Sequence, residues 1–208
     1  KNKLKIFKNK KNYGIGGSHK IVFNYLIENE FDYCLIIPSS YKGSPNEILK
    51  LFCTYQHNNP EVDVFFGKRI FKSHLDLNAK IVQRMSRNVA EPLKHLLSDY
   101  KFSDIGSRFI LIRVEVLKDL AFKSLSDGSE FNLQLNVLLT EVPDLKIREI
   151  ELKKWAFSNT DSAKILRYSG KMIKTMTHYG VNKYLFQRSG WRLFNDFPDN
   201  IEREFEII

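Results

Sequence analysis

Cysteine is scarce in this chain, whose 208 residues include only Cys34 and Cys53. Two well-separated cysteines exclude a small secreted domain held together by disulfides and favour a reducing compartment. The five histidines show no spacing typical of a metal site, and neither cysteine has a second one nearby. We therefore predict no zinc site.

Long apolar runs are also absent, since none approaches the roughly 18 residues that a helix needs to span a bilayer. We find no signal peptide, and the chain opens on Lys1 rather than Met, which favours a fragment of a longer protein. No Gly-x-Ser-x-Gly element or P-loop lysine motif occurs, which disfavours a hydrolase or a nucleoside triphosphatase. We expect a cytoplasmic location, including the cytoplasmic face of a membrane.

Hydrophobic and basic residues are abundant. The hydrophobic content is 43%, with sixteen Phe and nine Tyr, which predicts a packed globular domain. The formal charge is +9, from 33 Lys and Arg against 24 Asp and Glu. That charge suits phosphate-bearing partners, but a lysine-rich solvated surface explains it equally well. Nucleic acid is not expected as a partner, because no recognisable binding motif accompanies the charge.

Apolar periodicity predicts alternating strands and helices, the pattern of an α/β protein with mostly parallel strands. The apolar run ending at Pro38 predicts a strand covered on both faces, and Ser44 is placed to cap the helix that Pro45 begins. The predicted strands are 4–7, 31–37, 62–66, 108–112 and 145–152. The predicted helices are 18–29, 45–57, 78–97, 113–121, 130–140 and most of 161–188.

Five short segments follow one another in an informative order. They are Asn-Tyr-Gly-Ile-Gly-Gly at 12–17, the strand and Pro-Ser-Ser within 33–45, Val-Asp-Val-Phe-Phe-Gly-Lys-Arg at 62–69, Asp-Ile-Gly-Ser-Arg-Phe at 104–109, and Gly-Ser-Glu-Phe-Asn-Leu-Gln-Leu at 128–135. Together they resemble the family-two glycosyltransferases with the GT-A fold, particularly the dolichol-phosphate mannosyltransferase and polyprenyl-phosphate glycosyltransferase branch. The resemblance covers about residues 4–164.

The resemblance implies an α/β, GT-A-like (Rossmann-like) fold with a mainly parallel sheet flanked by helices. We expect this domain in residues 1–160, without the family's first β-α-β segment, and a basic, aromatic helical extension in 161–208. The implied reaction transfers a sugar from a nucleotide-diphosphate-sugar donor to a lipid-phosphate or glycan acceptor.

The chain departs from the family where a metal-binding Asp-x-Asp would stand, because Pro38, Ser39 and Ser40 replace it. Divalent ions prefer charged oxygen ligands, and no Asp or Glu occurs between positions 33 and 46. We therefore predict no metal cofactor. Two hypotheses remain open: a degenerate, non-catalytic domain, which we favour, and a metal-independent transferase in which Lys42 neutralises the leaving diphosphate.

The resemblance also suggests donor-binding residues. They are Gly14, Gly16, Gly17, Ser39, Ser40, Lys68 and Arg69. Backbone N–H groups at a glycine-rich helix start can hold a phosphate. Such turns are common for steric reasons alone, however, and we favour that interpretation.

Asp104 and Glu130 are the best remaining carboxylates for a base that takes a proton from the acceptor. A lipid-phosphate acceptor, already anionic, needs such a base less. For Glu130 we favour a structural role in the first turn of its helix. For Asp104, a role as the base and a role as a turn residue are equally favoured. Two other departures from the family are Arg108, in place of a glycine, and Gln134, in place of a glutamate.

The tail alternates basic with apolar and aromatic residues from Lys164 to Arg192. Such a helix can make a peripheral contact with a membrane. It can equally pack its apolar stripe on the core and expose its lysines, which is the commoner arrangement.

Overall fold

The structure is a computed structural model that describes residues 5–69, 104, 106–152, 162–189, 194 and 203–207. Five α-helices are described: α1 (Gly14–Glu28), α2 (Pro45–Asn58), α4 (Val114–Asp119), α5 (Phe131–Thr140) and α6 (Ser162–Gly180). A short 3₁₀ turn spans Phe122–Ser124, and a π-helical segment, Val181–Leu185, continues α6. The predicted helix at 78–97 lies outside the described residues.

Four strands form the main sheet, in the order β2-β4-β3-β5. They are β2 (Tyr33–Ile36), β3 (Val64–Arg69), β4 (Ile110–Arg113) and β5 (Ile147–Leu152). β4 lies between β2 and β3 and is antiparallel to both, whereas β3 and β5 are parallel. The sheet is therefore mixed.

The prediction of a mainly parallel, Rossmann-like sheet was wrong, because one central strand runs against its two neighbours. The apolar runs that suggested parallel strands indicate only that both faces of a strand are covered. Strand direction depends on how the chain returns to the sheet after β3, which side-chain periodicity does not encode.

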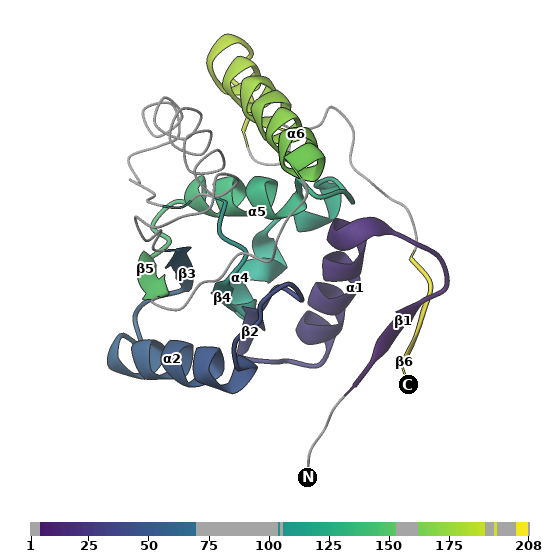
Figure 1. The fold of residues 1–208 in the computed structure, drawn as a ribbon. Coiled ribbons are helices and arrows are strands. Elements are labelled where there is room, and N and C mark those ends of the chain that lie inside the picture. Colours follow the sequence, from purple (N-terminus) through teal and green to yellow (C-terminus); the bar gives the residue numbers. More distant parts are fainter. Residues whose placement is uncertain are drawn as a thin grey trace.

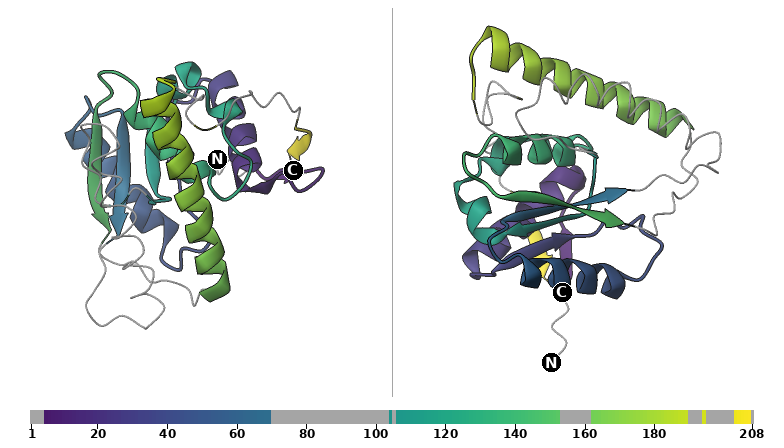
Figure 2. Two further views of the ribbon diagram at one scale, coloured as in Figure 1. Left: turned by 90° about the horizontal axis from the view of Figure 1, so that it is seen from above. Right: turned by 90° about the vertical axis from the view of Figure 1, so that its left-hand side faces the viewer.

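Helices cover both faces of the main sheet, which explains why β2 and β4 are almost continuously apolar. Along β2, Cys34 and Ile36 belong to the core beneath α1, α4 and α5, whereas Tyr33 and Leu35 pack against the core beneath α2. Figure 2 shows the sheet between α2 and α5, with α6 outside α5. The prediction that the strand before Pro38 is covered on both faces is confirmed.

A second, two-stranded sheet joins the two ends of the chain (Figure 1). It pairs β1 (Phe7–Asn9) with β6 (Phe205–Ile207) in antiparallel register. The predicted first strand thus lies outside the main sheet, and the tail ends as a strand rather than as helix. Pairing between residues so distant in sequence leaves no local signal.

Two core residues attach α6 to the domain. Met176 and Tyr179 are buried with the core that α1, α4 and α5 share. The Tyr179 hydroxyl donates to Glu141 Oε1 at 2.6 Å. Among the described helices, none combines the length and apolar character that crossing a membrane requires.

Candidate functional site

Three segments meet at the edge of the main sheet where β2 and β3 end and β4 begins. Ile110, the first residue of β4, is paired with Ile36 of β2 on one side and with Phe66 of β3 on the other. Residues 38–43, 67–69, 104 and 106–109 therefore lie at one edge, and we call them the strand-end site. It contains the predicted residues Ser39, Ser40, Lys42, Lys68, Arg69 and Asp104.

Close backbone packing holds two of these segments together. The Gly67 N–H donates to the Phe109 carbonyl at 2.8 Å, and the Ser107 hydroxyl donates to the Gly67 carbonyl at 2.5 Å. A Cβ on Gly67 would lie 2.7 Å from both Phe109 Cβ and Leu152 Cδ1. Asn136 of α5 donates to the Ser107 carbonyl at 3.0 Å, which ties the segment to the helix behind it.

The loop after β2 is anchored through Tyr41. Its N–H donates to the Pro38 carbonyl at 2.9 Å, and its ring meets Phe109 edge-on with centroids 5.3 Å apart. A Cβ on Gly43 would lie 2.2 Å from the Tyr41 hydroxyl oxygen, so glycine leaves room for this ring. Burial, followed by the charge of Glu47, raises the Tyr41 pKa. Around this anchor, three side chains are exposed: Ser39, Ser40 and Lys42.

At the end of β3, Lys68 is half-buried and its Nζ lies 3.7 Å from Glu151 Oε1 on β5. Arg69 is the last residue of the same strand. Both residues thus belong to the edge that also carries Lys42. A pair as long as Lys68–Glu151 contributes little stability, so Lys68 can exchange this carboxylate for a phosphate at low cost.

Asp104 is buried, with 6% of its surface exposed. Its N–H donates to Glu149 Oε1 at 3.2 Å, and its carbonyl accepts the Ser107 N–H at 3.1 Å. These contacts place Asp104 in the turn before β4, on the side of the sheet edge nearer β5. The exposed Ser39 and Ser40 follow β2, at the other end of the strand order.

Our sequence reasoning missed the two carboxylates of β5 that face this site, Glu149 and Glu151. The prediction for this strand considered only its apolar positions, as core residues. The neglected signal was the alternation itself: Glu151 lies between buried Ile150 and Leu152, and Glu149 precedes Ile150. Register then pairs Glu151 with Lys68.

The glycine turn begins α1, as Figure 1 shows, and packs against the loop before α5. Gly14 has a φ of +74°, and a Cβ there would lie 2.3 Å from the Asp127 carbonyl oxygen. A Cβ on Gly16 would lie 2.3 Å from the Ser126 carbonyl oxygen. The Gly14 N–H donates to Asn12 Oδ1, and the Gly16 N–H donates to the Asp127 carbonyl, both at 2.9 Å. Each glycine thus has a packing reason to be there.

The start of α1 already has an anion beside it, the Asp127 carboxylate. A Cβ on Gly17 would lie 3.3 Å from Asp127 Cγ. Lys20 Nζ lies 2.8 Å from Asp127 Oδ1, and Arg203 Nη2 donates to both carboxylate oxygens at 2.7 and 2.8 Å. We call Asp127, Lys20 and Arg203 the α1-start triad. A carboxylate of the chain itself thus occupies the kind of position that favours a phosphate.

Lys20 is almost completely buried, with 1% of its side chain exposed, and it also donates to the Leu125 carbonyl. A buried ammonium is costly unless it is paired and hydrogen-bonded. Periodicity could not reveal this residue, because a lysine within a helix is ordinarily expected on the solvent side. The partners Asp127 and Arg203 are remote in sequence.

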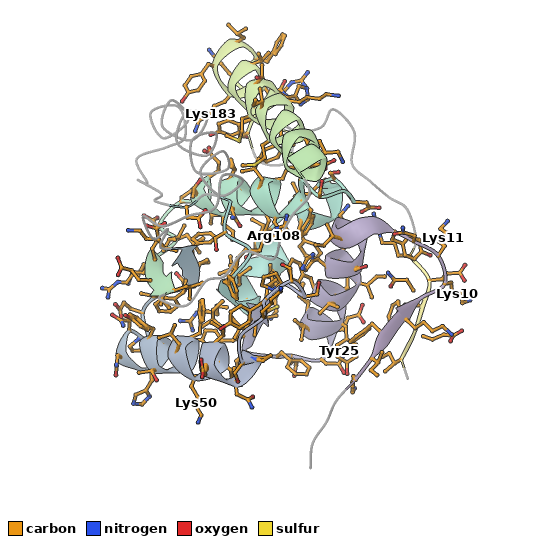
Figure 3. All side chains as sticks on the ribbon, in the orientation of Figure 1. Lys10, Lys11, Tyr25, Lys50, Arg108 and Lys183 are labelled. Carbon is orange, nitrogen blue, oxygen red and sulfur yellow. The ribbon has the colours of Figure 1, made fainter. Side chains whose placement is uncertain are left out.

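His19 is a further polar residue of α1 near the strand ends. Its ring stacks on Phe131 with centroids 5.4 Å apart, and its Nδ1–H donates to the Ile15 carbonyl at 2.8 Å. Burial lowers the His19 pKa; the bond to Ile15 opposes this effect and the charge of Arg108 reinforces it. The imidazole is therefore neutral at pH 7. Arg108, the departure from the family's glycine, lies within electrostatic reach of α1 (Figure 3).

Glu130 precedes α5 and links it to α6. It accepts from the Ser126 hydroxyl at 2.7 Å and from Lys171 Nζ at 3.2 Å. Burial raises the Glu130 pKa, but the bonds from Ser126 and Lys171 outweigh this effect, so the pKa is lowered. An ionised, tethered carboxylate fits the structural role that we favoured. Gln134, which stands in place of the family's glutamate, accepts the Ser126 N–H at 2.7 Å.

Within the described part of the chain, no three His, Cys, Asp or Glu side chains are grouped so that they could hold a metal ion. The chain matches no protein-family model, and no curated protein is significantly similar to it. The family resemblance therefore depends on the five short segments alone.

Proposed function

We propose that this protein is a metal-independent, glycosyltransferase-like protein that takes a nucleotide-diphosphate-sugar as donor and a lipid phosphate as acceptor, at the cytoplasmic face of a membrane. The observation that carries the proposal is the strand-end site. Lys42 and Lys68 stand there with two exposed hydroxyls, while the loop after β2 has no carboxylate for a metal.

The charge at this edge suits a diphosphate. A lysine near the leaving oxygen can stabilise the developing charge without a divalent ion. In the proposed step, an acceptor oxygen forms a bond to the anomeric carbon and the bond from that carbon to the diphosphate breaks. The nucleoside diphosphate leaves with the electron pair, and Lys42 and Lys68 bind its phosphates.

The burial of Asp104 supports a lipid phosphate rather than a glycan as acceptor. A glycan hydroxyl must lose a proton, and a base removes it only within hydrogen-bond reach. Asp104 is 6% exposed, which limits access to its carboxylate. A phosphate oxygen is already anionic and needs no base. We therefore expect Asp104→Asn to reduce transfer to a lipid phosphate by less than about fivefold, against roughly 100-fold for a hydroxyl acceptor.

The first test is donor binding. Thermal-shift measurements with UDP-, GDP- and dTDP-sugars, each with Mn²⁺ or with EDTA, should reveal stabilisation by one donor that EDTA does not remove. Lys42→Ala should weaken that binding about tenfold, because a charge-assisted phosphate contact is lost. Lys50→Ala is the matched control, since Lys50 is an exposed lysine on α2, away from the strand ends (Figure 3).

A second candidate function is a binding or scaffold domain that has lost catalysis. Two observations favour it: the loop after β2 has no acidic residue, and the chain's own Asp127 carboxylate lies at the start of α1. In that case a donor shifts the melting temperature without any sugar transfer, or no donor binds at all. EDTA-resistant transfer that Lys42→Ala abolishes would exclude the scaffold.

A further inference from the structure

The far end of α6 carries an exposed apolar surface that the proposed sugar transfer does not use. Three consecutive side chains there are largely exposed: Tyr184 at 53%, Leu185 at 75% and Phe186 at 61%. We call these three residues the α6 tip. Figure 1 shows α6 on the opposite side of the molecule from α2, with α5 between them.

The backbone beneath the α6 tip is firmly attached to the domain. Asn182 is 2% exposed, and the Lys183 ammonium donates to Glu141 Oε1 at 2.7 Å and to the Tyr179 hydroxyl at 2.8 Å. The Arg188 N–H donates to the Asn182 carbonyl at 2.9 Å. The segment that carries the exposed apolar side chains is thus held in place by the domain.

Local geometry explains why three neighbours in sequence point outward together. Residues 181–185 form a π-helical turn, which widens the helix and changes the direction in which its side chains leave it. Gln187 then adopts a φ of +51°, which ends the helix. The apolar stripe that packs Met176 and Tyr179 into the core is therefore not continued by the α6 tip.

The segment that ends in the α6 tip is positively charged by composition. Residues 162–189 contain no Asp or Glu, and their six cations are Lys164, Arg167, Lys171, Lys174, Lys183 and Arg188. Lys171 and Lys183 pair with acidic residues of the domain, whereas Lys174 is exposed. The Arg188 guanidinium lies over the Phe186 ring, 5.3 Å from its centroid, beside the apolar side chains.

We propose that the α6 tip docks the protein on an anionic lipid membrane, with Tyr184, Leu185 and Phe186 entering the headgroup region. Aromatic and leucine side chains next to cations are the combination that binds such an interface. Charge complementarity disfavours a second copy of the chain, because two acid-free cationic helices repel each other. The surface is defined independently of the strand-end site, so either proposal can fail alone.

The test is co-sedimentation with vesicles that contain neither nucleotide-sugar nor acceptor lipid. The wild type should bind vesicles of phosphatidylcholine with phosphatidylglycerol, bind pure phosphatidylcholine far more weakly, and detach as salt rises. The double variant Leu185→Ala/Phe186→Ala should bind at least tenfold more weakly, because it loses the inserted apolar area. Lys174→Gln should weaken binding to the anionic vesicles about fivefold.

Leu49→Ala is the matched control, because Leu49 is 47% exposed on α2, and it should bind like the wild type. Wild-type protein that stays in the supernatant with anionic vesicles overturns the proposal, as does equal binding by the double variant. Sedimentation velocity provides an independent outcome: a dimer that Leu185→Ala/Phe186→Ala dissociates would identify the α6 tip as a contact between copies instead.

Discussion

The α1 start and the strand-end site both lie at ends of regular elements, yet their charges are arranged in opposite ways. At the α1 start, the Asp127 carboxylate is bonded to buried Lys20 and Arg203. At the strand ends, Lys42 is exposed and Lys68 has only a long contact to Glu151. The glycine-rich turn is thus explained by folding. The positive charge that a ligand can reach lies instead at the edge of the main sheet.

The largest effect should follow from breaking the α1-start triad. Asp127→Ala leaves the Lys20 ammonium buried without its carboxylate, and removing one partner of a buried pair costs roughly 3–5 kcal/mol. Asp127 is 28% exposed, so we expect about 3 kcal/mol in urea unfolding. Glu204→Ala, which removes an exposed pair with Lys10, is the control and should leave the unfolding midpoint unchanged. A loss for Asp127→Ala no larger than that of the control contradicts the structural role.

A somewhat smaller loss is expected from Gly16→Ala. The added Cβ would lie 2.3 Å from the Ser126 carbonyl oxygen and 2.8 Å from Phe131 Cβ, so the loop or the helix must move. Overpacking of this kind costs about 1–3 kcal/mol. Gly170→Ala on α6 is the control, because a Cβ there meets nothing within 4 Å. A Gly16→Ala protein as stable as wild type would argue against steric need and return the turn to ligand binding.

The next effect is on acid stability and tests His19, which lies near both regions. The native pKa of His19 is lowered below the ordinary value of 6.5, mainly by burial. Unfolded chains therefore bind a proton that the native imidazole does not, so stability falls as the pH drops from about 6.5 toward that lowered pKa. The slope of this contribution approaches ~1.4 kcal/mol per pH unit.

Urea unfolding at pH 7.5 and at pH 5.5 measures this contribution. The loss between the two conditions should be smaller in His19→Gln than in the wild type. Comparing losses rather than absolute values removes the cost of the lost stacking on Phe131. Identical losses in the two proteins would mean that His19 is not held neutral by the fold.

The smallest effect on stability is expected at the strand-end site. This variant gives the clearest contrast with the α1 start. Lys68→Ala removes only a half-exposed contact to Glu151, so the free energy of unfolding should change by less than about 1 kcal/mol. Binding of the stabilising nucleotide-sugar should nevertheless weaken about tenfold, measured by titration calorimetry. Unchanged donor affinity in this stable variant would remove Lys68 from the site.

Most local elements were predictable, because their signals are local. Pro45 begins α2 as expected, and apolar spacing located α5 and the described part of the tail helix. Boundaries shifted where backbone pairing decided them: β3 extends to Arg69 because it pairs with β5 as far as Leu152. The helix start at Gly14, rather than at Ser18, reflects the close contact of the glycines with residues 126–127.

The candidate site was predicted in part. Placing Lys68 and Arg69 at a strand end followed from an apolar run with a basic end. Glu149, Glu151 and the α1-start triad could not be predicted, because their significance comes from pairings such as Lys20 with Asp127 and Arg203. The role of a charged residue depends on the residue that it contacts. Side-chain periodicity does not predict such contacts.

The amino-acid sequence alone determined where most of the described helices and the strands of the main sheet lie, that β2 is covered on both faces, and that the loop after β2 has no carboxylate. These properties depend on side-chain spacing and residue type within a few positions. Only the tertiary structure decided that β4 runs antiparallel between β2 and β3, that the two ends of the chain pair, and that Asp127 occupies the start of α1. The physical reason is that strand direction and ion pairing depend on the path of the chain between distant residues.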